Sequence, residues 1–180
     1  MKKYALPIII SLLCLLFIGG IVMTHSSSIS PYEFLIGKYK DAMPIEKPVQ
    51  QIYIAEQDNT VLVFYINENG NLSCAVLQKK FFSYRVLQTS AELSTHSQNR
   101  SADFLYSSNQ RDTRERESVH WGIIYNPLVT KVTINDQEMK MIEAEGLRLC
   151  FLLKPGGFPP NSSEDYQLFD AQGNIITNTI

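Results

Sequence analysis

Val61-Leu62-Val63-Phe64-Tyr65-Ile66 is the stretch that decides the fold of this chain. Its side chains are aliphatic or aromatic at every position, so an extended strand built from it is apolar on both faces. A strand of that kind is buried on both sides and lies in the interior of a sheet. The dipeptide Asn69-Gly70 follows shortly afterwards and is typical of a hairpin turn. The stretch therefore predicts the central strand of an antiparallel sheet.

The neighbouring segments predict the rest of that sheet. Before it, Ile52 and Ile54 alternate with more polar residues, which indicates a strand with two different faces. After it, Leu72–Phe81 and Tyr84–Leu93 predict two further strands around a turn at Phe82-Ser83. The four strands together predict an antiparallel meander.

The segment Ser94–Ser118 interrupts this alternation. It is rich in Ser, Asn, Gln and charged residues, and the arginines and acidic residues at positions 111–117 cancel in charge. This composition predicts a solvated loop that is the least ordered part of the exported domain. The apolar triplet Phe104-Leu105-Tyr106 in its middle is expected to pin the loop to the surface.

Turn residues then separate a second series of short strands. The expected strands are Val119–Tyr125, Lys131–Asn135, Glu138–Ala144, Leu147–Leu153, Tyr166–Asp170 and Ile175–Thr177. About nine or ten short strands, with turn signals every 8–12 residues, indicate an all-β fold. We expect either an antiparallel sandwich or an open barrel.

The N-terminus carries an uncharged apolar run, Tyr4–Met23, after Lys2 and Lys3. About 20 residues at ~1.5 Å each span the roughly 30 Å of a bilayer core, so the run predicts one transmembrane helix. Because the basic start is expected to stay in the cytoplasm, we expect a single-pass protein of the cell membrane with an extracytoplasmic C-terminal domain. A cleaved signal peptide, which would release a secreted β domain, is the alternative.

On this interpretation the chain has three parts. Residues 1–25 form the signal anchor, residues 26–48 a linker with a short helix, and residues 49–180 the extracytoplasmic β domain. The helix is expected to run to Asp41, with Ser30 as its N-cap and Pro31 as its first residue. Apolar residues recur along it at helical spacing: Tyr32, Leu35, Ile36 and Tyr39. We expect this face to pack against the domain rather than to lie in the membrane interface.

Several of these segments are similar to a known group of proteins. They are Val61–Tyr65, Ala75-Val76-Leu77, Trp121–Pro127, Val132, Ile134-Asn135 and Leu147–Leu153. In them the chain resembles small uncharacterised exported or membrane-anchored β-rich proteins of Gram-positive bacteria. The likeness covers most of the chain from Val49 onward and consists of strand and turn patterns. It implies an extracytoplasmic β domain and carries no catalytic residues.

Composition and charge exclude several classes of function. The chain is 44% hydrophobic and 19% charged, which excludes wholesale disorder. Its 16 basic residues include Lys2 and Lys3, so 14 basic residues face 18 acidic ones in the exported part, a formal charge of −4. That charge argues against nucleic acid as a partner.

Residues that could support catalysis or metal binding do not converge in the sequence. His25, His96 and His120 fall in the linker, the loop and a strand. Glu143 and Glu145 form a spaced carboxylate pair that is common at exposed strand ends. No Gly-x-Ser-x-Gly motif or phosphate-binding loop occurs. We therefore expect no enzyme, metal or cofactor, and a small cell-envelope hydrolase is the alternative.

Two cysteines and the single tryptophan lie on predicted strands. Cys74 and Cys150 are expected to be free thiols, because each suits a small buried position on its strand. Trp121 shares a strand face with Val119 and Ile123, which predicts a core position. An exposed aromatic platform for a ligand is the alternative for Trp121.

One surface patch is a candidate contact site for lipid or a partner. Three cations and three aromatic residues meet at a predicted hairpin tip: Lys79, Lys80, Phe81, Phe82, Tyr84 and Arg85. Such a tip suits anionic lipid head groups, a cell-wall polyanion or an acidic protein. The alternative is that the aromatics belong to the core and the lysines protect a strand edge. The sequence thus predicts a membrane-anchored, non-enzymatic module that acts in binding, in sensing or as an accessory protein. Its ligand cannot be predicted from the sequence.

Overall fold

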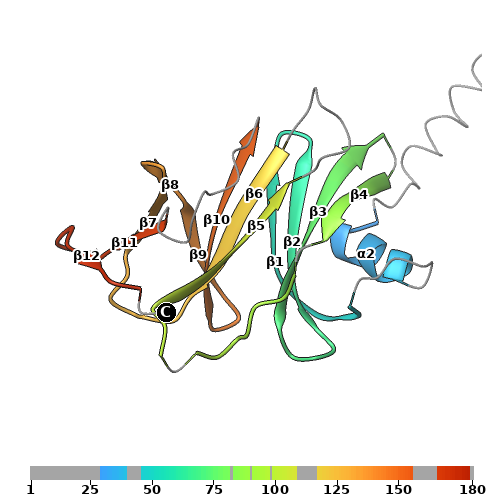
Figure 1. Cartoon of the computed structure of the whole chain (residues 1–180). Coiled ribbons are helices and arrows are strands. Elements are labelled where there is room, and N and C mark those ends of the chain that lie inside the picture. The colour runs from blue at the N-terminus through green and yellow to red at the C-terminus, as the bar shows by residue number, and fades with distance from the viewer. Residues whose placement is uncertain are drawn as a thin grey trace, which may run out of the picture.

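The computed structural model of the chain describes residues 29–39, 46–81, 83–89, 91–97, 99–108, 117–155 and 166–178. These residues form an all-β fold, with three antiparallel sheets of four strands each and one short helix (Figure 1). We call them the N-terminal, central and C-terminal sheets. Among these residues no helix is both long and apolar enough to cross a membrane; the predicted span, 4–23, lies outside them.

The N-terminal sheet is the meander that the sequence predicts. Its strands are β1 (Pro48–Gln57), β2 (Thr60–Asn67), β3 (Leu72–Lys80) and β4 (Ser83–Thr89), in the order β1-β2-β3-β4. Strand β2 pairs with β1 on one side and with β3 on the other, and seven of its eight residues are buried. The prediction that residues 61–66 form a central strand is confirmed.

Each face of the N-terminal sheet covers a separate hydrophobic cluster. One cluster joins Val61, Val63 and Tyr65 of β2 to Leu35 of helix α2 (Pro31–Tyr39). The other joins Leu62 and Phe64 to the central sheet. Because successive side chains of a strand point to opposite faces, the all-apolar run of β2 contributes to both clusters.

Helix α2 begins with a capping box. The N–H of Glu33 donates to the Ser30 hydroxyl oxygen at 3.1 Å, and the N–H of Ser30 donates to the Glu33 carboxylate at 3.0 Å. Pro31 is the first helical residue, as predicted. The buried face differs from the predicted one, because Phe34 packs against the sheet whereas Ile36 is exposed. The helix packs against the domain as expected; residues 40–45 lie outside the described ones.

The central sheet contains a strand that sequence analysis missed. Its strands are β5 (Ala102–Ser108), β6 (Glu117–Ile124), β10 (Leu147–Pro155) and β9 (Lys140–Ala144), in the order β5-β6-β10-β9. The predicted loop 94–118 is therefore wrong for residues 102–108 and 117–118. Residues 98 and 109–116 lie outside the described part of the chain.

Strand β5 is stabilised by contacts that its own sequence does not reveal. It pairs with β6 along its whole length, and Ala102 is fully buried. Leu105 packs on the cluster shared with the N-terminal sheet, whereas Phe104 stacks on Tyr166 of the C-terminal sheet with ring centroids 4.1 Å apart. The apolar triplet therefore belongs to a strand between two layers and does not pin a loop.

Trp121 lies in the cluster between the N-terminal and central sheets. Its side chain is 0% exposed and meets the Phe64 ring edge-on, with centroids 5.8 Å apart. The predicted core position is confirmed. The next residue, Gly122, lets the edge strand approach, because a Cβ there would stand 2.4 Å from the carbonyl oxygen of Asp103.

The C-terminal sheet is built from short strands. They are β7 (Lys131–Ile134), β8 (Gln137–Glu138), β11 (Tyr166–Phe169) and β12 (Ile175–Ile176), in the order β12-β11-β7-β8. The prediction of one strand over 138–144 is wrong, since the chain passes from β8 to β9, in a different sheet, at Met139. Met139 is buried, and its N–H donates to the carbonyl of Val132 at 2.9 Å.

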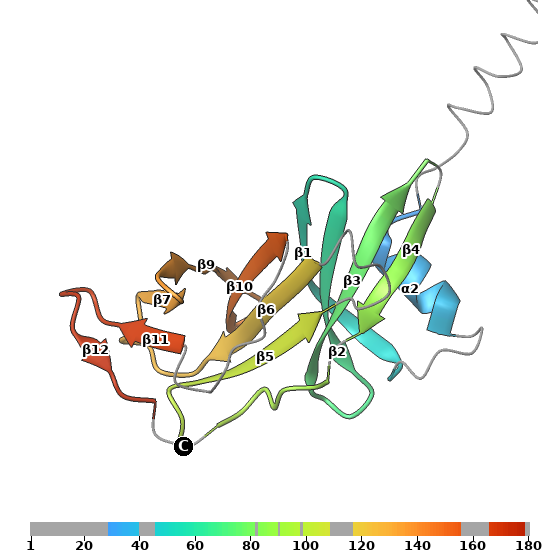
Figure 2. The same ribbon diagram turned by 45° about the horizontal axis from the view of Figure 1, so that its top comes forward.

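Helix α2 and the three sheets lie side by side as successive layers, and Figure 2 shows the same order from a second direction. The central sheet is covered on both faces, because its Ile124 and Cys150 share a second cluster with Leu168 of the C-terminal sheet. Cys74 belongs to the first cluster. Both cysteines are buried and form no disulfide among the described residues, as predicted. None of the three sheets, as described, closes on itself.

Candidate functional site

Two residues of the predicted contact patch are held by the domain itself. Lys79 forms an ion pair with Glu56 of β1, with Nζ and the carboxylate oxygen 2.5 Å apart. The hydrogen bond to this carboxylate raises the pKa of Lys79. Tyr84 is half-buried, and its ring packs against Phe34 of α2 at 5.7 Å. Tyr84 therefore fits the alternative interpretation, packing on the domain, whereas Lys79 protects no strand edge, because β3 is paired on both sides.

Three other residues of the patch form an exposed tip. Lys80 pairs with Ser83 across the end of the β3–β4 hairpin. Lys80 and Arg85 are exposed, and Phe81 is 87% exposed. Phe82, the sixth predicted residue, lies outside the described residues. We call Lys80, Phe81 and Arg85 the hairpin tip.

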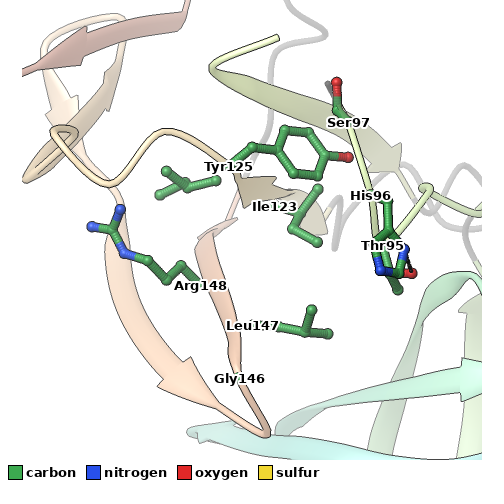
Figure 3. Close-up of a pocket in the computed structure, with 9 residues that line it drawn as sticks. Thr95, His96, Ser97, Ile123, Tyr125, Gly146, Leu147 and Arg148 are labelled. Atoms are coloured by element: carbon green, nitrogen blue, oxygen red, sulfur yellow. Dashed lines mark hydrogen bonds between the residues drawn. The ribbon is translucent and has the colours of Figure 1, made fainter. Parts of the chain in front are cut away.

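A pocket of about 380 Å³ lies at one end of the central sheet, against the segment that follows β4 (Figure 3). Its lining comes from three places in the chain: Thr95-His96-Ser97, Ile123-Ile124-Tyr125 and Gly146-Leu147-Arg148. The pairing of β6 with β10, which sets Ile123 opposite Leu149, brings the last two together. Sequence analysis missed this pocket, because no local signal links the three segments.

The segment at one rim of the pocket is fastened to the N-terminal sheet. Leu93 exchanges two backbone hydrogen bonds with Leu72, each 2.8 Å long. The Thr95 hydroxyl donates to the carbonyl of Gly70 at 3.3 Å and also lies 2.9 Å from Nδ1 of His96. The exposed imidazole of His96 is therefore held at the mouth of the pocket.

Tyr125 forms a second wall. Its hydroxyl donates to the carbonyl of Ser94 at 2.7 Å and lies 3.1 Å from the carboxylate of Asp103. Asp103 in turn forms an ion pair with Arg100 at 2.8 Å. Burial and, second, the charge of Asp103 raise the pKa of Tyr125. The phenol therefore stays protonated at neutral pH and acts as a fixed wall.

Arg148 lines the pocket with its alkyl stem. Its guanidinium donates to the carbonyl oxygens of Asn126 at 2.9 Å and Val129 at 2.5 Å, and its Nε lies 3.4 Å from the carboxylate of Glu143. Figure 3 shows this guanidinium directed away from Leu147. Arg148 thus holds the loop between β6 and β7 in place.

The pocket combines an apolar floor with a polar rim. Ile123 and Leu147 supply the floor, and Thr95, His96 and Ser97 form a polar rim at one side. This combination suits noncovalent binding of a small, partly apolar group.

The other predicted histidines are not part of this pocket. His120 is 2% exposed and lies between the central and C-terminal sheets, where its Nδ1 is 3.0 Å from the hydroxyl of Tyr166. Its ring centroid is 4.8 Å from that of Tyr106. His25 lies outside the described residues. Within the described ranges, no three His, Cys, Asp or Glu side chains gather to hold a metal ion.

The two glutamates singled out in the sequence lie at the surface, as expected at a strand end, and a second pair of carboxylates meets elsewhere. Glu143 and Glu145 are both exposed, and Glu143 faces Arg148. A separate pair, Glu46 and Glu92, meets over the buried amide of Asn67, which donates to both. The hydrogen bond to Glu92 raises the pKa of Glu46, and the bond from Asn67 lowers the pKa of Glu92. The Asn67 amide thus links Glu46, just before β1, to Glu92, in the segment after β4.

Comparison with known proteins leaves the site to be interpreted from its geometry. No protein-family model, no curated protein sequence and no solved structure matches the chain. The pocket and the hairpin tip are therefore the features from which we infer the function.

Proposed function

We propose that the chain is a membrane-anchored, extracytoplasmic module that binds a ligand through the pocket and catalyses no reaction. The observation that carries this proposal is the pocket, whose volume of about 380 Å³ is in the range of small-molecule sites. It lies between three chain segments, each held by hydrogen bonds or strand pairing. A lining whose segments are held in this way loses less conformational freedom on binding.

The anchor is supported by the sequence. The uncharged run Tyr4–Met23 follows Lys2 and Lys3, and the next basic residue is Lys38. This asymmetry favours a cytoplasmic N-terminus and an extracytoplasmic domain in a single-pass protein of the cell membrane. The resemblance to small exported or membrane-anchored proteins of Gram-positive bacteria supports the same location.

We further propose that the N-terminal and central sheets form a β-sandwich that carries the pocket. Their facing side chains share one cluster, in which Phe64 lies 5.8 Å from Trp121 and 5.7 Å from Phe151 between ring centroids. In sandwiches, binding residues gather on the loops at the ends of a rigid core. The pocket has this position, since the segment after β4 and the β9–β10 turn both line it.

Noncovalent binding fits the pocket better than hydrolysis. A nucleophile needs a base that is itself oriented by a third group. Nδ1 of His96 faces the hydroxyl of Thr95, but no carboxylate among the described residues bonds to that imidazole. Asp103 is already occupied by Arg100 and Tyr125. A binding module for a small partly apolar ligand or a partner's side chain is the function that the lining supports.

Site-specific photo-crosslinking in intact cells tests the pocket. A photo-reactive residue in place of His96 is expected to give adducts, whereas the same residue in place of exposed Gln172, in the β11–β12 turn, gives none. Leu147→Trp is expected to fill the pocket and abolish the adducts, and the volume-conserving Leu147→Met is expected to keep them. Adducts that survive Leu147→Trp, or that are equal at both positions, would contradict the proposal.

The anchor has a separate test. Protease added outside intact cells is expected to digest residues 49–180 while the first residues stay protected. A second test fuses to the C-terminus a reporter that works only in the cytoplasm. Activity of this reporter would show that the C-terminal domain is cytoplasmic and would exclude this location.

A further inference from the structure

The hairpin tip exposes an aromatic ring and two cations. Phe81 is 87% exposed, and Lys80 on β3 and Arg85 on β4 are also exposed. The nearby acidic residue Glu56 is neutralised by Lys79. An aromatic ring at this exposure is accessible to a membrane surface, and exposed cations in the same hairpin suit anionic head groups.

This tip lies at the end of the domain where the described chain begins. Phe34, in the first half of α2, packs against Tyr84. Tyr84 pairs with Lys79, one residue before the tip. Figures 1 and 2 both show the arrowhead of β3 and the start of α2 on the same side of the molecule.

The length of chain before α2 limits the distance between the tip and the bilayer. The predicted span ends at Met23, and Ile29 is the first described residue. Six steps of extended chain cover at most about 20 Å. The side of the domain that carries the start of α2 is therefore the side that faces the bilayer.

From these observations we propose that the hairpin tip docks on anionic lipid head groups of the membrane in which the chain is anchored. Phe81 enters the interfacial layer, and Lys80 and Arg85 contact head-group phosphates. The inference rests on the proposed anchor. Asp58, exposed in the neighbouring β1–β2 turn, opposes the attraction, so docking depends on the fraction of anionic lipid and weakens as salt screens the charges.

Because the chain is anchored in the same membrane, a weak contact is sufficient for the hairpin tip to dock. Because the anchor and the tip belong to one chain and few residues separate the anchor from α2, the tip stays near the surface at an effective concentration of about 1 mM. A contact with a dissociation constant of that size is then half-occupied. Three residues are therefore enough to orient the domain, although they would not recruit a free protein to the membrane.

Docking in this way presents the pocket to the outside. The rim segment is bonded to Gly70 and Leu72, at the start of β3, whereas the tip follows the end of β3 at Lys80. Nine strand residues at about 3.3 Å each separate these ends by roughly 25–30 Å. The docked domain holds its pocket away from the bilayer, where a ligand of the cell envelope can reach it.

Tryptophan fluorescence of the full chain in lipid nanodiscs tests the docking. Phe81→Trp places a reporter at the tip, and Leu128→Trp is its matched control, because Leu128 is 68% exposed in the β6–β7 loop away from α2. In discs of phosphatidylglycerol and brominated phosphatidylcholine, about half of the emission from the indole introduced at the tip is expected to be quenched. The emission also shifts to the blue. The control, and both variants in purely zwitterionic discs, are expected to change little.

Charge reversal distinguishes lipid docking from other causes. Lys80→Glu with Arg85→Glu is expected to remove the quenching, whereas Lys131→Glu with Lys140→Glu, the same change in charge on β7 and β9, leaves it intact. A chain that does not enter the discs refutes the anchor and the docking with it. A chain that enters without quenching at position 81 refutes the docking alone. A blue shift without bromine quenching assigns the tip to a protein surface, of the disc scaffold or of a second copy of the chain, and overturns the lipid contact.

Discussion

The N-terminal and C-terminal sheets differ in how their strands come together. The N-terminal sheet is made of four consecutive strands of seven to ten residues, each paired with the next. The C-terminal sheet is made of strands of two to four residues, and its central pair, β7 and β11, is separated in the chain by β8, β9 and β10. The N-terminal sheet is formed by strands that are neighbours in the sequence, whereas the C-terminal sheet pairs strands that are far apart in the sequence.

This difference indicates that the C-terminal sheet depends on the central sheet for its stability more than the N-terminal sheet does. The N-terminal sheet has an apolar cluster of its own beneath α2, in addition to the cluster that it shares with the central sheet. The C-terminal sheet has only the cluster that it shares with the central sheet, among the described residues. Strands this short are not stable without a packed partner. We therefore expect the cost of a core substitution to be larger on the N-terminal side of the central sheet.

The largest effect is expected for Trp121→Ala, between the N-terminal and central sheets. It removes a fully buried ring and should lower the free energy of unfolding by roughly 3–5 kcal/mol. The indole Nε1 has no hydrogen-bond partner among the described groups, so the loss is one of packing. Urea unfolding of the full chain in mild detergent measures it. Unchanged stability, with red-shifted and easily quenched emission in the unmutated protein, would place Trp121 at the surface instead.

A smaller effect is expected for Leu168→Ala, between the central and C-terminal sheets. Leu168 is 1% exposed, but the short strands around it can relax into the space, so we expect a loss of about 2–3 kcal/mol. Hydrogen exchange should rise in β7 and β11 while β2 stays protected. Equal loss of protection in β2 would show that the two sides of the central sheet unfold as one unit.

Gly122→Ala tests the close approach of β5 to β6. The added methyl meets the Asp103 carbonyl, so we expect a loss of about 1–3 kcal/mol and faster exchange in β5. Gly37→Ala in α2 is the matched control, because nothing lies within 4 Å of its Cβ position. That control should be neutral or slightly stabilising. Similar losses in both variants would argue against steric contact as the cause.

The smallest effect is expected at the helix cap, outside both inter-sheet clusters. Ser30→Ala removes half of the capping box and should cost about 1 kcal/mol, whereas Ser30→Asp keeps an N-cap acceptor. Hydrogen exchange in α2 measures the change. If Ser30→Asp is as damaging as Ser30→Ala, the hydroxyl has another role.

The same cap predicts a pH dependence. Hydrogen bonds from the backbone and hydroxyl of Ser30 lower the pKa of Glu33 below its ordinary value of 4.5. A lowered pKa in the folded state means that the contribution is fully present above pH 4.5 and is lost as pH falls through the lowered pKa. Protection of α2 should therefore decline in acid, and this decline should be weaker in Ser30→Ala.

Much of the N-terminal half follows from local patterns. The apolar run 61–66, the turn at Asn69-Gly70 and the cap at Ser30 each act within a few residues, and each is confirmed. The missed strand β5 differs, because its polar neighbours dominate the composition and its partner β6 begins after residues 109–116. The break at Met139 has a different cause. Polar and apolar residues keep alternating there while the chain passes from one sheet to another, so the sequence does not mark the break.

The two candidate sites show the same division. The hairpin tip is contiguous in sequence, so its cations and aromatics can be recognised from the sequence. Only the structure shows that Tyr84 is packed and Phe81 is exposed. The pocket draws on three segments between positions 95 and 148. No pattern within one segment indicates the other two.

The sequence by itself determined that this protein is all-β, that its first sheet is a meander, and that Trp121, Cys74 and Cys150 lie inside. These properties depend on alternation, turn residues and side-chain hydrophobicity, which act over two to five residues. Only the tertiary structure decided the third sheet, the strand β5 and the pocket. Those features depend on which faces bury each other across the central sheet, and that choice is made by packing between residues far apart in the chain.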